Sequence, residues 1–253
     1  MRAYRAAFSA RFRALLQYRT AAAAGFVTQV FWGLIRMMIF EAFYRSSSAP
    51  QPMTREQVIS YVWLGQATFA MLPAWLDSEV QASIRGGNVS YELLRPLNLY
   101  NFWFARNLAA RIAPALLRGC PMLVVAWLFF GLDLPASPAS ALGWTAATAA
   151  AALLSASLCT LTCVSLLWTL SGEGVSRFLG VLIWILSGIV LPLPLFPDWL
   201  QPLLNLLPFR GLMDVPFRVW TGHIPTAAAV PNILSVLAWT LALIVAGNIL
   251  MAW

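Results

Sequence analysis

The residues that could carry out chemistry are few in this chain. Its 253 residues include one histidine, His223, and no lysine. A P-loop needs a lysine to reach the terminal phosphates of a nucleotide, so this chain cannot carry that motif. Proteases, acyltransferases and zinc enzymes of the membrane need histidine and acidic side chains grouped within the spans, and we find no such group. We therefore expect no catalytic residue and no cofactor bound by this chain.

Two cysteines have a spacing that could serve a metal ion. Cys159 and Cys163 are one helical turn apart, so both thiols could face the same ion. A structural zinc site needs four ligands, and no histidine or acid stands near this pair to complete them. Buried, inert thiols explain the pair better, and we expect no metal site.

Composition indicates the class of protein. Hydrophobic residues make up 60% of the chain and charged residues only 10%, whereas a soluble domain is nearer about 45–50% apolar and ~25% charged. A chain this apolar predicts a polytopic membrane protein. All 16 basic residues are arginines, and they are scattered near the ends of apolar stretches. We therefore expect anionic lipid headgroups, rather than nucleic acid, as their counter-charge.

The hydropathy pattern predicts an all-α membrane protein with six transmembrane helices. The predicted spans are residues 21–44, 58–76, 112–132, 141–170, 178–191 and 227–253. The fourth span is rich in Ala, Ser and Thr, which let helices approach closely in lipid. The fifth is short for a full crossing, which favours broken or re-entrant helices at Pro192 and Pro194, within an outer segment of residues 192–225.

Residues 1–20 predict an amphipathic helix at the membrane interface. Its apolar sector consists of Tyr4, Phe8, Phe12, Leu15 and Leu16, and the far side carries Arg2, Arg5 and Arg13. Residues 1–40 contain no acid, which also suits a cleaved transit peptide. We favour an uncleaved helix leading into the first span, because the apolar stretch that follows is long enough to cross and is one of several.

The arginine distribution predicts the side on which each loop lies, because positive charge stays in the cytoplasm. The N-terminal helix, the loop 77–111 and the turn before the fifth span carry Arg2, Arg5, Arg11, Arg13, Arg19, Arg85, Arg95, Arg106, Arg111 and Arg177. The opposite loops carry Arg45, Arg55, Arg210 and Arg218. We expect both termini and the loop 77–111 to be cytoplasmic, and the segment 192–225 to face outward.

The longest polar interruption of the chain is residues 76–100. One stripe of a short helix is formed at i, i+4 and i+8 by Leu76, Val80 and Ile84. The pair Gly86-Gly87 lacks the Cβ atoms that resist a left-handed cap, so the helix is predicted to stop there. Such a helix could dock a soluble partner or lie on lipid headgroups, and the pattern alone supports both interpretations equally.

Three arginines near the predicted third span have two explanations. Arg111 and Arg118 are seven residues apart and share a helix face, and Arg106 lies five residues earlier. They could form a basic lining for an anionic substrate. They could also snorkel to the headgroups, since Arg118 lies only about 9 Å along the helix from its cytoplasmic start. We favour snorkelling.

Two stretches together resemble a known family. They are Ile84–Asn98, IRGGNVSYELLRPLN, and Leu191–Phe209, LPLPLFPDWLQPLLNLLPF. With the six-span plan, they resemble the permease subunit of bacterial ABC-2 type ABC transporters, in the branch that has paired permeases beside a separate ATPase. The motifs are patterns of Gly, Pro and apolar residues rather than catalytic signatures, and the resemblance covers essentially the whole chain.

The resemblance implies roles for three segments. Residues 76–85 would match the coupling helix that docks on the nucleotide-binding subunit. The residues implied in that contact are Leu76, Asp77, Glu79, Val80, Ile84, Arg85, Gly86 and Gly87. Residues 4–16 would match the interface helix, and residues 192–225 would match the short helices that cap the pathway.

The resemblance also implies partners and a mechanism. Two copies of an ABC ATPase would bind ATP and magnesium, and a second permease, of the same or a different chain, would complete the path through the lipid. Closure of the ATPases would push on the coupling helix and shift the spans between two global states. The complex would be an exporter of the bacterial inner membrane.

A secondary carrier or channel that works without ATP is the alternative function, and a membrane enzyme is a third. A proton-coupled carrier needs acids deep in the membrane, whereas Glu41 and Glu173 lie near the ends of predicted spans. The enzyme lacks the required side chains. Co-purification with an ATPase would separate the first hypothesis from the other two.

Overall fold

The computed structural model describes residues 2–47, 50–73, 77–169 and 173–252, and every regular element in these ranges is helical. The first half contains α1 (Arg2–Leu16), α2 (Arg19–Ser46), α3 (Arg55–Thr68), the turn η1 (Phe69–Met71), α4 (Ser78–Arg85), α5 (Val89–Leu93), α6 (Leu99–Pro114), the π-helical turn η2 (Ala115–Gly119) and α7 (Cys120–Phe129). The second half contains α8 (Pro138–Thr169), α9 (Glu173–Leu186), η3 (Leu193–Leu195), η4 (Asp198–Leu200), α10 (Gln201–Leu206), η5 (Pro208–Gly211), α11 (Asp214–Trp220) and α12 (Thr226–Ala252).

Four of the described helices are long and apolar enough to cross a membrane. They are α2, the continuous run α6–η2–α7, α8 and α12, with lengths of 28, 31, 32 and 27 residues. At ~1.5 Å per residue each exceeds the ~30 Å thickness of the hydrocarbon core. The chain is therefore an all-helical, multi-pass membrane protein.

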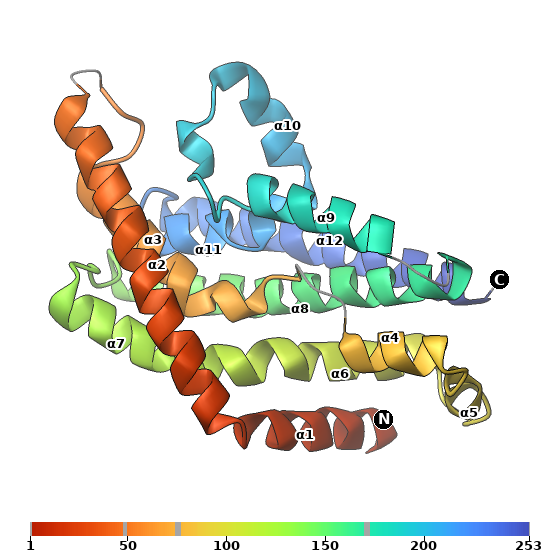
Figure 1. The fold of residues 1–253 in the computed structure, drawn as a ribbon. Coiled ribbons are helices and arrows are strands. Elements are labelled where there is room, and N and C mark those ends of the chain that lie inside the picture. The colour runs from red at the N-terminus through yellow and green to blue at the C-terminus, as the bar shows by residue number, and fades with distance from the viewer. Residues whose placement is uncertain (1, 48–49, 74–76, 170–172, 253) are drawn as a thin grey trace.

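The central helix of the bundle is α8, which packs against α6, α11 and α12 (Figure 1). In the most apolar 18-residue stretch of α8, 78% of the residues are buried. In the corresponding stretches of the other three long helices, 17–22% are buried. Its buried side chains are mostly small, as the Ala-, Ser- and Thr-rich sequence predicts, and these allow neighbouring helices to come close. The other three long helices leave most of their surface free for lipid or a partner.

Helix α3 lies inside the bundle and is shorter than predicted. Every residue from Val58 to Thr68 is buried. With 14 residues, the helix is only about 21 Å long, so it does not by itself match the thickness of a bilayer. Within the described part of the predicted span 58–76, residues 58–73, the helix continues to Met71, including η1. It ends there because Pro73 biases Leu72 to an extended conformation, with φ −63° and ψ 132°.

Helix α6 begins at Leu99, well before residue 112, where the sequence predicted the third span to start. The last part of the predicted loop 77–111 is therefore helical and continuous with α7. Pro114 cannot donate a main-chain hydrogen bond, and the chain accommodates it by widening into the π-helical turn η2 rather than by ending the helix.

Helix α9 ends earlier than the two prolines predict. It stops at Leu186, and the break falls at Ser187-Gly188 rather than at Pro192. Gly188 has a φ of +87°, and a side chain there would collide with the hydroxyl of Tyr61 on α3. The break is thus fixed by a tertiary contact, and the outer segment then continues through η3, η4, α10, η5 and α11.

Contacts between distant residues define the two ends of the bundle. At the end that holds α4 and α5, which we call the α4 end, the main-chain N–H of Asn98 donates to the hydroxyl of Tyr4 and its side-chain amide to Asn248, both at 3.0 Å. Helices α1, α6 and α12 therefore meet at the α4 end (Figure 1). At the opposite end, the indole of Trp220 donates to the main-chain oxygen of Asp133 at 2.8 Å.

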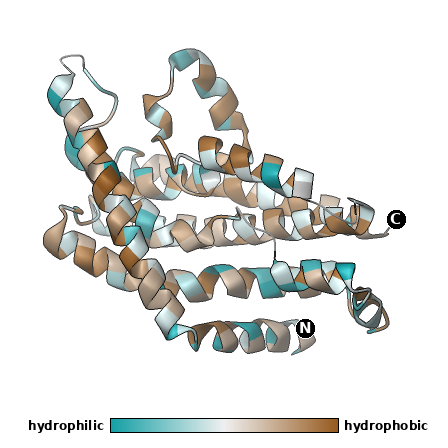
Figure 2. Cartoon of the chain, in the orientation of Figure 1, coloured by the Kyte–Doolittle hydropathy of each residue, from teal (hydrophilic) through white to brown (hydrophobic). Residues whose placement is uncertain are grey.

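The outer surface of the bundle is strongly apolar. Figure 2 shows hydrophobic residues along α2, α7 and α12 and hydrophilic ones in parts of α4. On α12, the exposed apolar side chains include Val230, Leu234, Leu241, Val245 and Ile249. Exposed apolar surface on this scale is stable in contact with lipid or with another apolar chain.

Candidate functional site

Helix α4 is defined at both ends by local chemistry. The carboxylate of Asp77 accepts a hydrogen bond from the main-chain N–H of Glu79 at 2.9 Å, which caps the first turn. The helix ends at Gly86, and Gly87 follows with a φ of +72°, as the glycine pair predicts. The short helix therefore has fixed limits within the polar stretch.

One face of α4 is buried against its own chain. Val80 is 1% exposed and Ile84 8% exposed. They form a hydrophobic cluster with Leu99, Tyr100, Trp103, Cys163, Val164 and Leu166, which belong to α6 and α8. Both residues were predicted to contact an ATPase, but the structure uses them to attach α4 to two long helices. Leu76, the third member of the stripe, lies outside the described residues.

The opposite face of α4 is accessible. Ser78, Ala82 and Arg85 are exposed and lie one and two turns apart, and successive residues of a helix are ~100° apart, so this stripe points away from Val80 and Ile84. Of the predicted docking residues, Glu79, Arg85, Gly86 and Gly87 are exposed and Asp77 is buried as the cap. The sequence analysis missed Ser78 and Ala82, which the i, i+4 spacing opposite the apolar stripe could have identified.

Helix α5 extends this accessible surface with large apolar side chains. Tyr91 is 69% exposed, Leu93 60% and Leu94 83%. The helix is held in place from beneath, where the indole of Trp103 donates to a carboxylate oxygen of Glu92 at 2.8 Å. Exposed apolar residues beside a polar helix are typical of a protein-binding surface. We define the α4–α5 surface as nine exposed residues of these two helices and the turns that follow them: Ser78, Glu79, Ala82, Arg85, Gly86, Gly87, Tyr91, Leu93 and Leu94.

Ion pairs connect this surface to the N-terminal helix. Glu79 binds the guanidinium of Arg11 on α1 and, at 2.5 Å, that of Arg106 on α6. Arg11 also lies 3.9 Å from Asp77, and Arg106 lies 3.8 Å from Glu92. A movement of α4 would therefore pull on both α1 and α6.

Exchanging charges tests this connection. Glu79→Arg places a third positive charge between Arg11 and Arg106, so we expect the midpoint of thermal unfolding to fall by about 2–4 °C. Adding Arg11→Glu restores one ion pair and should recover part of the loss, measured by tryptophan fluorescence of the purified protein. Arg13→Glu is the matched control, because Arg13 is exposed on another face of α1. Equal recovery with Arg13→Glu would contradict the pairing.

Helix α1 packs along α6 (Figure 1). The apolar sector predicted from the sequence is half-buried throughout, while Arg2, Arg5 and Arg13 are exposed. The rings of Phe8 and Phe12 stack with centroids 5.7 Å apart. The amphipathic pattern of α1 is thus used, at least in part, to pack against its own chain.

The three arginines near the third span have separate structural roles. Arg106 belongs to the ion pairs of Glu79. Arg111 is buried and donates to the main-chain oxygen of Leu72 and to the sulfur of Cys159, both at 3.0 Å. Arg118 passes over Gly25 of α2, where a Cβ would lie 2.7 Å from the guanidinium. Arg111 is therefore a link between α6, α8 and the segment that leads into α4, and neither a substrate lining nor a snorkelling side chain.

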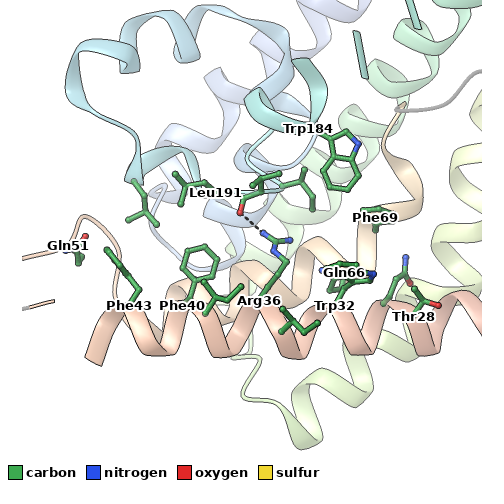
Figure 3. A pocket seen from close by; sticks show the side chains of 16 residues that line it. Thr28, Trp32, Arg36, Phe40, Phe43, Gln51, Gln66, Phe69, Trp184 and Leu191 are labelled. Atoms are coloured by element: carbon green, nitrogen blue, oxygen red, sulfur yellow. Dashed lines mark hydrogen bonds between the residues drawn. The ribbon is translucent and has the colours of Figure 1, made fainter. Parts of the chain in front are cut away.

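A large pocket lies on the other side of the bundle, between α2, α3, η1, α9 and residues 189–195 (Figure 3). Its volume is about 820 Å³, within the range of pockets that bind small molecules. The lining residues are Thr28, Gln29, Trp32, Ile35, Arg36, Ile39, Phe40, Phe43, Gln51, Gln66, Phe69, Trp184, Ile189, Val190, Leu191 and Leu195. Arg36 is the only charged residue that the described part of the chain contributes to this lining.

These features define a class: a helical membrane protein with no catalytic cluster recognised in its sequence, an accessible small helix at one end and a separate pocket lined by α2, α3 and α9. The chain matches the family model of the ABC-2 family transporter proteins over residues 30–252, and it belongs to this family. It is therefore a transmembrane permease of an ABC transporter, a membrane component whose ATPase lies in a partner subunit. Membership also implies association with a partner permease. A search of curated proteins found no match.

Proposed function

We propose that the chain is the permease of an ATP-driven exporter and forms half of its translocation path. Two copies of an ATPase would bind and hydrolyse ATP with magnesium, and a second permease, identical or different, would face this one in the bacterial inner membrane. The observation that carries the proposal is the α4–α5 surface, a rigidly attached and accessible surface in a chain of the ABC-2 family.

Six crossings of the membrane are the topology that this proposal requires. Besides the four long helices, two short helices carry the chain between the ends of the bundle. The segment that contains α3 begins near Thr221, because the side-chain amide of Gln57 donates to the main-chain oxygen of Thr221 at 3.4 Å. The segment then leads to Asp77 at the α4 end. Helix α9 comes after α8 in the chain and leads back towards Asp214. The main-chain N–H of Asp214 donates to the main-chain oxygen of Ser187, directly after α9, at 3.2 Å. Packing against the longer helices would cover the main-chain groups that these short crossings leave unpaired.

The charge distribution supports a cytoplasmic α4 end. Arg2, Arg5, Arg13 and Arg95 are exposed on the helices and loops that meet there. Positively charged segments are retained in the cytoplasm, where the ATPase must also be. This orientation puts both ends of the described chain in the cytoplasm and the segment 192–225 on the outer side.

The route from the ATPase to the spans would run through two attachments of α4. Val80 and Ile84 bind it to α6 and α8. Arg111 of α6 donates hydrogen bonds to the main-chain oxygen of Leu72 and to the sulfur of Cys159 on α8. The segment ahead of α4 is therefore fixed to the same two helices. A push on α4 would then move α6 and α8 as a unit. Coupling of this kind requires two arrangements of the spans that ATP binding shifts.

Purification from the native membrane tests the proposal. We expect the tagged chain to be recovered with an ATPase, and intact-mass measurement should give two ATPase copies beside two permeases. Nucleotide should be required for any solute movement by the reconstituted complex. Recovery of the chain alone, together with solute movement in the absence of nucleotide, would overturn the proposal in favour of a carrier or channel.

A further inference from the structure

Among the described residues, Arg36 has no acidic partner, although it lies deep in an apolar helix. It lies ten residues before the end of α2 at Ser46, which is about 15 Å at ~1.5 Å per residue. A charged side chain at such a depth is costly unless it is paired or bonded. In the described part of the chain, Arg36 has no ion pair, and Glu41 is already bound by Arg45 at 3.0 Å and Arg55 at 2.6 Å.

The guanidinium of Arg36 lies in the wall of the 820 Å³ pocket, with most of its donors unused. One Nη donates to the main-chain oxygen of Val190 at 3.0 Å, the only hydrogen bond of this side chain among the described residues. Figure 3 shows this bond reaching across the pocket from α2. A guanidinium has five N–H donors in a planar fork that matches an oxyanion, so the arrangement leaves room for an anionic group.

Both sides of Arg36 carry polar and apolar lining residues. Gln66 and Thr28 lie on one side together with aromatic residues, and Phe40 and Phe43 lie on the other side with Gln51 (Figure 3). Gln29, which is 5% exposed, lines the same pocket, and its buried side-chain oxygen has no hydrogen-bond partner within the described part of the chain. An unpartnered buried oxygen costs free energy unless a ligand supplies a donor.

We infer that this pocket binds an amphiphile whose single anionic group pairs with Arg36 and whose apolar chain packs against Phe40 and Phe43. The same chemistry occurs in a membrane phospholipid and in an exported solute with an acidic group. This inference rests on the proposed function only in treating the occupant as a candidate for export. The pocket binds its ligand without nucleotide, so binding can be measured independently of the ATPase.

Tryptophan quenching provides the first test, since Trp32 and Trp184 both line the pocket. The complex is placed in nanodiscs of zwitterionic lipid and titrated with a brominated alkyl sulfonate or with the alcohol of the same chain. We expect the sulfonate to bind more tightly, and Arg36→Gln to weaken sulfonate binding about tenfold or more, as for loss of a charge-assisted hydrogen bond. Alcohol binding should be unchanged, which also shows that the variant is folded.

Arg118→Gln is the matched control, because Arg118 also lies within a long helix but is outside the pocket. The sulfonate preference should survive in this variant, and Arg36→Lys should keep part of it. Equal binding of sulfonate and alcohol, or a preference that persists in Arg36→Gln, would overturn the inference. Either result would leave ATP-dependent transport, and hence the proposed function, untouched.

Mass spectrometry of lipids that co-purify with the complex distinguishes the two sources. If an anionic phospholipid is the occupant, it should be retained by the wild-type complex and lost with Arg36→Gln. If an exported solute is the occupant, the co-purified lipids should be the same in both while sulfonate binding still depends on Arg36. Both outcomes support an anionic amphiphile; a complex in which neither measurement depends on Arg36 refutes it.

Discussion

Replacing Ala82 with tryptophan is expected to abolish the productive contact with the ATPase while leaving the permease folded. Ala82 is at the centre of the exposed face of α4, between Ser78 and Arg85. If the ATPase packs against the methyl group of Ala82, an indole at this position would hold the ATPase and α4 apart. Steric clashes of this kind strongly weaken binding. We expect the affinity for the ATPase to fall about tenfold or more, equivalent to at least ~1.4 kcal/mol.

The measurement is binding of the purified ATPase to the permease in nanodiscs, together with the ATP hydrolysis that the complex supports. Both should fall with Ala82→Trp, and the thermal unfolding midpoint should stay at the wild-type value, because residue 82 is exposed and does not contribute to the packed core. This combination separates a lost contact from a lost fold. A headgroup-bound helix would give the opposite result, since tryptophan is favoured at the membrane interface.

Ala139→Trp is the control for this prediction. Ala139 is also an exposed alanine within a helix, but it lies in the first turn of α8, at the opposite end of the bundle from α4. The substitution adds the same surface where no ATPase is proposed to bind. Equal loss of ATPase binding in both variants, or wild-type binding in Ala82→Trp, would contradict docking through the α4–α5 surface.

Features set by neighbouring residues could be predicted from the sequence. The four long helices follow from apolar runs that exceed the thickness of a bilayer. The limits of α4 follow from Asp77 at its start and Gly86-Gly87 at its end, because capping acts within a few residues. The small residues of α8 predicted close packing, and α8 is the central helix.

Features set by distant residues could not be predicted. The stripe of Val80 and Ile84 has the same pattern whether it faces an ATPase or its own core, and only the packing of Tyr100 and Trp103 decides between them. Arg111 has the spacing of a snorkelling residue. Its hydrogen-bond partner Leu72 is 39 positions away, so the local sequence could not show that Arg111 is buried. The start of α6 at Leu99 was missed for the same reason: Arg106 and Arg111, the two charged residues of this helix, find their partners through tertiary contacts.

The same limit applies to the pocket. Arg36 has no partner at the helical spacings of three or four residues, and the acid five residues away is used by other arginines. Its hydrogen bond to Val190 joins segments 154 positions apart. The break of α9 at Gly188 likewise depends on Tyr61, which belongs to a different helix. Helix-breaking residues show that a break exists, whereas tertiary contacts set its position.

Substituting Gly119 should destabilise the bundle more than substituting either Gly25 or Gly174. Gly119 ends η2, and a Cβ built on it would lie 2.5 Å from the main-chain oxygen of Ala67 on α3. This oxygen belongs to a helix that is buried on every side, so it cannot move aside as a flexible side chain would. We expect Gly119→Ala to lower the free energy of unfolding by about 3 kcal/mol, the upper part of the range for overpacked cores.

The other two glycines provide a graded comparison within the same protein. At Gly25 the nearest atoms belong to the guanidinium of Arg118, whose long side chain can shift, so Gly25→Ala should cost less. At Gly174 on α9, a Cβ would meet no atom of the described residues within 4 Å outside its own stretch of helix, and alanine is favoured there by its helix propensity of up to ~1 kcal/mol. Gly174→Ala should therefore be neutral or stabilising.

Thermal unfolding of the three purified variants, followed by tryptophan fluorescence in detergent, measures this order. Because η2 and α3 approach closely, the unfolding midpoint should fall most for Gly119→Ala. It should fall less for Gly25→Ala and not at all for Gly174→Ala. If Gly119→Ala does not yield purified protein, the amount of folded protein by size-exclusion chromatography gives the same ranking. A wild-type midpoint for Gly119→Ala would mean that α3 is not packed against η2, and the buried position of α3, on which its proposed short crossing depends, would be wrong.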